Sequence, residues 1–359
     1  MRIPTLNSGG SLRQSVTRMT ALRHQYRTGP ARERRTRGAA AARPRPIEWP
    51  TLAVAALVYA SFGLLTWFHE GLPWWLLLIC GGFITCLHGS LQHEVVHGHP
   101  TRWHWLNQAL VFPSLWLWMP YRTYERTHLE HHYDPALTHP LEDPESYYVT
   151  PETWARLGPA LRGLLWVINS AAGRLLIGPL RSVLLLLMSE GKALLRGERA
   201  PLLDWSLHLV GAGLVIAWVV WACGMDVWLY VATFAYPGLS LTLLRSFLEH
   251  QARPDLGERT VLVEAGPVMS LLFLNNNLHA LHHAEPGTAW YRLPARYRLK
   301  RDELLAENRG YRYRNYLEVL ARYLLWPKEP PVHPFVDTAV VFATRDDAHQ
   351  QTLRPVAPA

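Results

Sequence analysis

Four long apolar runs without charged residues alternate with polar stretches along this chain. They cover Thr51–Phe68, Leu72–Leu91, Trp205–Gly224 and Val227–Leu244. Each run is 18 to 20 residues long, and about 20 apolar residues suffice for an α-helix to cross the hydrocarbon core of a bilayer. The pattern therefore predicts four membrane spans in two hairpins, with tight turns at His69–Gly71 and near Met225–Asp226.

The shorter apolar stretches predict helices that do not cross the bilayer. Leu106–Met119 is 14 residues long and contains Pro113, which favours a re-entrant or interfacial segment. Between residues 161 and 199, leucines alternate with arginine and lysine, as is typical of amphipathic helix on a bilayer surface. The chain from Gln251 onward is polar apart from Val268–Leu274, which we expect to form a partly buried helix.

The distribution of arginine predicts the orientation of the spans. Residues 1–46 contain eleven arginines and a single acid, Glu33, so we expect a disordered cytosolic N-terminus. With this end inside, both hairpins return the chain to the cytosol, and both outer turns lack Lys and Arg. The predicted fold is an all-α polytopic membrane protein, in which a domain over 47–330 has four transmembrane helices in two hairpins and a cytosolic helical cap, followed by a tail over 331–359. In a bacterium it would lie in the inner membrane.

Charge and cysteine content narrow the possible partners and metal ligands. The net charge of +8 is concentrated beside the first apolar run, where anionic lipid rather than nucleic acid is the expected counterion. The three cysteines, Cys80, Cys86 and Cys223, all lie in apolar runs, which excludes a disulfide framework and a cysteine-ligated cluster. Any metal must therefore be held by imidazole.

Histidines gather in three clusters, each near the end of an apolar run. The first is His93-Glu-Val-Val-His97, and the other two read His-Leu-Glu-His-His at 128–132 and His-Ala-Leu-His-His at 279–283. On a helix, residues at i+3 and i+4 both lie near residue i but diverge by about 100° around the axis, so they can serve two different metal ions. With His250 as a ninth, the imidazoles suffice for two ions with four or five nitrogens each. The candidate ligands are His93, His97, His128, His131, His132, His250, His279, His282 and His283.

Two alternatives to an oxidative metal site stay open at this point. The first cluster also matches the HExxH motif of zinc metalloproteases, in which two histidines bind zinc and the glutamate activates water. That function gives the other two clusters no role. The second alternative is a non-catalytic metal-handling membrane protein. Imidazole suits zinc, copper, iron and nickel, so the ligand type alone does not choose the metal.

The remaining histidines do not keep the cluster spacing. His88 and His208 lie within predicted spans, and we expect them in hydrogen-bonded contacts between helices. His99, His104 and His139 are close to the clusters in sequence and are expected at the surface or behind the ligands.

The clusters resemble the three histidine boxes of the membrane fatty acid desaturase family. The resemblance covers about residues 50–330 and includes Tyr124-Glu-Arg-Thr-His128, the acidic run Leu-Glu-Asp-Pro-Glu-Ser at 141–146, and Asn276-Asn-Leu-His279. It implies a diiron centre that activates O₂ for attack on an unactivated C–H bond of an acyl or similar chain. In family members with a ninth histidine, an Asn four residues earlier helps to hold one iron through water, and this chain has Ser246 at that position.

The resemblance also implies cofactors and partners. Two iron ions and O₂ are required, and the residues expected to orient the imidazoles are Glu94, Glu130, Glu249 and Asn276. The chain has no His-Pro-Gly-Gly haem motif, no cysteine set and no Gly-rich dinucleotide fingerprint. A separate ferredoxin, rubredoxin or cytochrome-like electron donor is therefore implied.

The expected function is an O₂-dependent desaturase that introduces a C=C bond into an acyl-lipid or acyl-thioester. The alternative within the same superfamily is a hydroxylase or ketolase acting on an alkane, fatty acid, sphingolipid or carotenoid, because both reactions use the same ligands. The chemistry is assigned to the metal centre, and the sequence identifies no substrate-binding residue.

Overall fold

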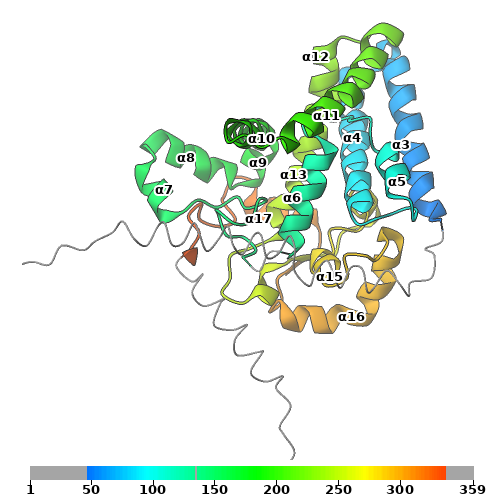
Figure 1. The fold of residues 1–359 in the computed structure, drawn as a ribbon. Coiled ribbons are helices and arrows are strands. Elements are labelled where there is room, and N and C mark those ends of the chain that lie inside the picture. The colour runs from blue at the N-terminus through cyan, green and yellow to red at the C-terminus, as the bar shows by residue number, and fades with distance from the viewer. Residues whose placement is uncertain (1–46, 134–135, 337–359) are drawn as a thin grey trace, which may run out of the picture. The chain divides into compact units, whose positions relative to one another are not determined.

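Residues 47–133 and 136–336 are described by the computed structural model, and this part of the chain is mostly helical (Figure 1). The predicted N-terminal tail 1–46 lies outside the described residues, as do residues 337–359 of the predicted C-terminal tail.

Four helical segments are long and apolar enough to cross a membrane, as the hydrophobic pattern predicts. The first two are single helices, α3 (Trp49–Trp67) and α4 (Trp74–Val96). The third, Ala200–Ala222, consists of α11 (Ala200–Ala217) and the π-helical η2 (Trp218–Ala222). The fourth, Val227–Glu249, consists of α12 (Val227–Tyr230), the π-helical η3 (Val231–Ala235) and α13 (Tyr236–Glu249). The second and fourth segments each run five residues beyond the predicted end. The extra turns carry polar residues that are buried and bonded in the site described below, so the helices continue past the apolar runs.

Small residues allow the second and fourth spans to lie very close together. A Cβ at Gly238 would lie 2.5 Å from Cβ of Thr85, and a Cβ at Gly81 would lie 2.6 Å from the carbonyl oxygen of Thr233. Without side chains at these positions the two backbones approach directly, which is the usual way in which membrane helices gain packing energy. The two segments that deliver the chain to the histidine clusters are therefore held against each other.

The apolar core continues from the spans into the polar part of the chain. Phe62 of α3 packs edge-on against Tyr230 and Phe234 of the fourth span, with ring centroids 6.2 and 6.3 Å apart. The same buried cluster includes Phe273 and Tyr316, which belong to the segment after the last span. This shared core fixes the polar segments relative to the ends of the spans.

Outside the four long segments, the described chain forms helices of 3 to 18 residues. They are η1 (His69–Gly71), α5 (His104–Leu110), α6 (Tyr121–Tyr133), α7 (Pro151–Arg156), α8 (Pro159–Ile168), α9 (Ala171–Leu176), α10 (Gly178–Leu195), η4 (Leu256–Arg259), α14 (Pro267–Leu272), α15 (His279–Ala284), η5 (Trp290–Arg292), α16 (Leu293–Glu307) and α17 (Tyr316–Tyr323). The all-α prediction missed one small sheet, in which β1 (Leu262–Val263) pairs in parallel with β2 (Arg312–Tyr313). Two residues per strand carry no alternating pattern that a sequence could display.

Two predicted surface segments are partly helical. The segment 106–119 is helical only to Leu110 at the end of α5, and its depth in a bilayer stays a prediction. The region 161–199 forms α8, α9 and α10, and on α10 the apolar side chains of Leu180, Leu184 and Met188 are about half exposed. An exposed apolar face on a helix with basic residues is what a bilayer surface would cover.

Candidate metal centre

All nine predicted histidines lie at or near helix ends that meet in one place. His93 is in the last turn of α4 and His97 caps that helix, while His250 caps α13 at the end of the fourth span. The second cluster lies in α6 and the third in α15. In Figure 1, α15 lies at the lower end of α4, whereas α12 lies near the top of the view.

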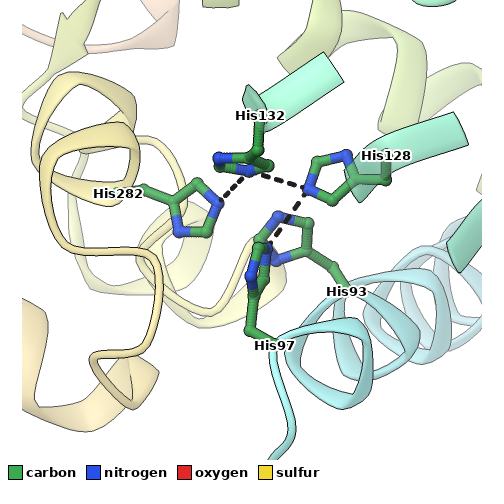
Figure 2. A group of neighbouring side chains, drawn as sticks. All are labelled: His93, His97, His128, His132 and His282. Atoms are coloured by element: carbon green, nitrogen blue, oxygen red, sulfur yellow. Dashed lines mark hydrogen bonds between the residues drawn. The ribbon is translucent and has the colours of Figure 1, made fainter. Parts of the chain in front are cut away.

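Five histidines form one group, which we call the five-histidine group. Its members are His93, His97, His128, His132 and His282, and one ring nitrogen of each lies within 4.8 Å of those of the others. Figure 2 shows the rings pointing toward a common centre from α4, α6 and α15. Nε2 of His132 is 3.0 Å from Nε2 of His128 and 2.9 Å from that of His282, and Nε2 of His97 is 3.3 Å from that of His128.

The other four histidines form a second set, the four-histidine group. One ring nitrogen each of His131, His250, His279 and His283 lies within 4.8 Å of the others. Nε2 of His250 is 3.0 Å from that of His131 and 3.1 Å from that of His279, and His279 is 3.2 Å from His283 through the same atoms. The structure thus brings His250 into this group with the three histidines from α6 and α15.

The sequence spacing explains how the clusters divide between the groups. In α6, His128 and His132 at i and i+4 join the five-histidine group, while His131 at i+3 joins the other. In α15 the assignment is reversed, since His279 and His283 join the four-histidine group and His282 joins the five-histidine group. On a helix, the side chains at i+3 and i+4 point in directions about 100° apart. This difference explains why each of the two helices contributes histidines to both groups.

The donor set fits metal ions. A histidine nitrogen binds such an ion at about 2.0–2.1 Å, so two nitrogens at right angles around it are about 3 Å apart. The six neighbouring nitrogen pairs named above, three in each group, are 2.9 to 3.3 Å apart. Burial lowers the pKa of His132 to about 2 and places those of His250, His282 and His283 well below the ordinary range, so these imidazoles are neutral and carry the lone pair that a metal requires.

Carboxylates fix the orientation of two imidazoles, one in each histidine group. Nδ1 of His128 is 2.8 Å from Oε1 of Glu145, and Nδ1 of His131 is 2.8 Å from Oδ1 of Asp143. Donation from Nδ1 leaves Nε2 of each ring free to face its group, which is the usual carboxylate–histidine arrangement behind a metal. Both acids belong to the acidic run 141–146 of the sequence, and neither was among the residues predicted to orient the imidazoles.

The four residues predicted to orient the imidazoles differ in their contacts. Oδ1 of Asn276 is 3.0 Å from Nδ1 of His279, and Oε1 of Glu249 is 3.4 Å from the same nitrogen. Glu94 is buried but accepts a hydrogen bond of 3.1 Å from the backbone N–H of Trp290. No hydrogen bond or ion pair joins Glu130 to a histidine in the part of the chain that the structure describes.

Three consecutive asparagines position the third cluster. The Asn275 side chain donates to the carbonyl of Trp290 at 3.0 Å and that of Asn277 to the carbonyl of Val263 at 2.7 Å. Asn275 has a φ of 59°, a left-handed conformation that asparagine tolerates better than most residues. The amide of Asn276 lies between the two groups, because its Nδ2 is 3.2 Å from His93 Nε2.

The histidines that were predicted to lie outside the ligand sets are absent from both groups. Nε2 of His88 is 3.4 Å from the Tyr59 hydroxyl, and Nε2 of His208 is 3.1 Å from the carbonyl of Leu117. His99 is paired with Glu48 at 2.7 Å. The remaining two, His104 and His139, are likewise absent from the groups.

The sequence of this chain matches the model of a known protein family. The family model described as fatty acid desaturase matches residues 69–315, which is more than half of the chain and includes all nine histidines. A search of curated proteins found no significant match.

Proposed function

The chain belongs to the fatty acid desaturase family, and from this premise we propose that it is an O₂-dependent desaturase that introduces a C=C bond into an acyl chain. The family is one of oxidoreductases acting on lipids in membranes, and the four apolar helices indicate an integral membrane protein. The observation that carries the proposal is the division of nine histidines into two adjoining groups of five and four.

In this proposal each histidine group holds one iron ion. Iron held in this way would supply the activation of O₂ that removal of hydrogen from an unactivated methylene requires. The choice of iron is supported by the family, since imidazole ligands alone suit several metals. The proposed ligands are the nine histidines named above.

The chain's own residues prepare the site. Asp143 and Glu145 hold the Nδ1 protons of His131 and His128, which keeps Nε2 of each ring directed inward. Burial lowers the pKa of His132 and of the three histidines in α15, which keeps these imidazoles neutral. Glu94 is held by the Trp290 backbone and is buried, which argues against its use as the water-activating glutamate of a zinc protease.

The proposed topology places the metal centre and the N-terminus in the cytosol. The second and fourth spans both run toward the histidine groups, so the turns that precede them, at 69–71 and 223–226, lie at the opposite ends of the spans. Neither turn contains Lys or Arg, as expected for turns on the outer side. The membrane domain proposed in this way covers residues 47–330 and consists of two hairpins with a cytosolic helical cap.

Electrons are proposed to come from a separate protein. The three free cysteines are apart from the histidine groups, and the sequence contains no haem or dinucleotide motif. A ferredoxin, rubredoxin or cytochrome-like donor would supply the two electrons that each turnover consumes.

Product analysis with ¹⁸O₂ tests the proposed reaction. The full-length protein is expressed with a matched electron donor, and the lipids of the host are profiled for new double bonds and for ¹⁸O. A double bond without label in the lipid is the expected result. Label in the product would instead assign the chain to the hydroxylases or ketolases of the superfamily.

A further inference from the structure

A small cavity lies beside the four-histidine group. It has a volume of about 50 Å³ and is lined by residues that include His250, Ser246, Phe247, Tyr147, Arg174 and Lys328. A water molecule needs roughly 10–15 Å³ by the same kind of measure. The cavity therefore has room for a small polar group of several atoms next to the end of α13.

Arg174 of α9 lines this cavity, and no carboxylate among the described residues pairs with it. Its side chain is buried, and its guanidinium carbon lies 3.4 Å from the centroid of the Tyr147 ring. Nε and Nη2 make long contacts of 3.4 Å to the carbonyl of Ile168 and to Oδ1 of Asn169. Nη1 is buried and has no hydrogen-bond partner within residues 47–133 and 136–336. A buried guanidinium of this kind is costly unless an anion pairs with it.

The carboxylates that line the same cavity are all engaged elsewhere. Asp143 and Glu145 accept hydrogen bonds from imidazoles of the two histidine groups. Glu329 accepts a hydrogen bond from the Tyr148 hydroxyl and is paired with Lys328 at 3.7 Å. None of these acids forms an ion pair with Arg174 in the described part of the chain.

Two further cations lie near Arg174, and one of them, Lys328, is paired with Glu329 at 3.7 Å. Nζ of Lys328 is buried and donates to the carbonyl of His250 at 2.6 Å. The Arg181 guanidinium carbon is 4.7 Å from the centroid of the Tyr147 ring, the same ring that Arg174 covers. Burial lowers the pKa of Arg174 only to about 10, so the guanidinium stays charged at neutral pH.

We propose that this cavity binds the oxyanion, carboxylate or phosphate, of the lipid substrate, with Arg174 as the residue that anchors it. A guanidinium has parallel N–H donors that match two oxygens of either anion. Since His250 lines the same cavity, the bound oxyanion would position the lipid beside the four-histidine group. The inference rests on the proposed function only in taking a lipid as the substrate.

Direct binding tests the proposal without turnover. The full-length protein in maltoside detergent is dialysed at equilibrium against labelled dodecanoate, dodecyl phosphate and 1-dodecanol at neutral pH. At least one of the two anions should bind about tenfold or more tightly than the alcohol, because a charge-assisted hydrogen bond is roughly twice as strong as a neutral one. Preference for dodecanoate alone identifies a fatty acid carboxylate, and preference for dodecyl phosphate alone identifies a phosphate headgroup. Equal affinity for all three lipids would overturn the proposal.

Variants locate the binding site. Arg174→Gln should abolish the preference for the anion and leave the binding of dodecanol and the iron content unchanged, whereas Arg156→Gln, an exposed arginine of α7, should bind like the wild type. An unchanged preference in Arg174→Gln contradicts the assignment. If that variant does not fold, amide exchange in the wild type decides: the preferred anion, but not dodecanol, should slow exchange in Ala171–Leu176, and no slowing there would refute the site. Absence of any oxidised product would count against the proposed function and not against this binding.

Discussion

His131 and His132 are adjacent in the chain but point into different histidine groups. Nε2 of His131 lies 3.0 Å from His250, and Nε2 of His132 lies 2.9 Å from His282. Neighbouring residues on a helix diverge by about 100°, so one turn of α6 supplies histidines to both groups. The helix α15 also divides its histidines between the groups, with His282 in the five-histidine group and the other two in the four-histidine group.

Single replacements of these two histidines should affect different metal ions. His131→Ala should remove the iron of the four-histidine group and His132→Ala that of the five-histidine group, and each should abolish activity because the reaction requires both ions. Iron per chain, measured by mass spectrometry of metals on purified protein, checks this. His139→Ala should retain both ions, since His139 is absent from the groups. Equal iron loss in all three variants would contradict the assignment.

The carboxylate behind His131 should matter more than the glutamate next to it in sequence. Asp143→Asn keeps the shape of the side chain but removes the charge that accepts the Nδ1 proton of His131. Loss of such a partner lowers metal affinity by about 10- to 100-fold, which competition with a chelator would measure. Glu130→Gln is the control and should bind iron like the wild type. Comparable weakening in both variants would show that Asp143 has no special role.

Close packing of α4 against α13 should be sensitive to a single methyl group. Gly238→Ala places a Cβ 2.5 Å from Cβ of Thr85, and overpacking of this kind costs about 1–3 kcal/mol. The variant should therefore lose iron and inactivate at a lower temperature, because these two helices carry His93 and His250. Gly213→Ala in α11 meets no atom within 4 Å and should inactivate at the wild-type temperature or slightly above it.

The ion cluster around Glu264 should make stability depend on pH. Burial raises the pKa of Glu264, but hydrogen bonds from Arg301, Tyr297 and Arg312 outweigh this effect and lower the pKa from 4.5 to about 2. A lowered pKa in the folded protein means that the stabilisation is complete above about pH 4.5 and is lost as the pH falls toward 2. Glu264→Gln should therefore reduce the free energy of unfolding by about 1 kcal/mol at pH 7.

Thermal unfolding in detergent at several pH values checks the role of Glu264. The difference between wild type and Glu264→Gln should shrink as the pH is lowered below 4.5. Glu303→Gln, an exposed residue of α16, should show no such difference. A constant difference between wild type and Glu264→Gln at all pH values would refute the electrostatic explanation.

Much of the fold and the ligand set follows from local sequence patterns. The apolar runs predict the four spans because a bilayer requires a fixed length of apolar helix. The division of His131 and His132 between two groups follows from helical geometry alone. These features depend on residues within a few turns of one another, which is the range over which sequence periodicity is informative.

Features that depend on distant contacts were not predictable. Asp143 lies 12 residues from His131, and Glu145 lies 17 residues from His128, so no helical spacing links these acids to the histidines that they contact. The π-helical segments η2 and η3 occur within apolar spans and have no local sequence signature. Arg174 stands in a segment that is amphipathic in sequence, and its burial depends on the residues packed around the cavity.

The metal content of the purified full-length protein tests the central claim most directly. The nine imidazoles in two adjoining groups predict two iron ions per chain when the protein is produced in iron-sufficient medium. About one zinc per chain with no iron would contradict a diiron centre and would return the HExxH histidines, His93 and His97, to the role of a zinc site.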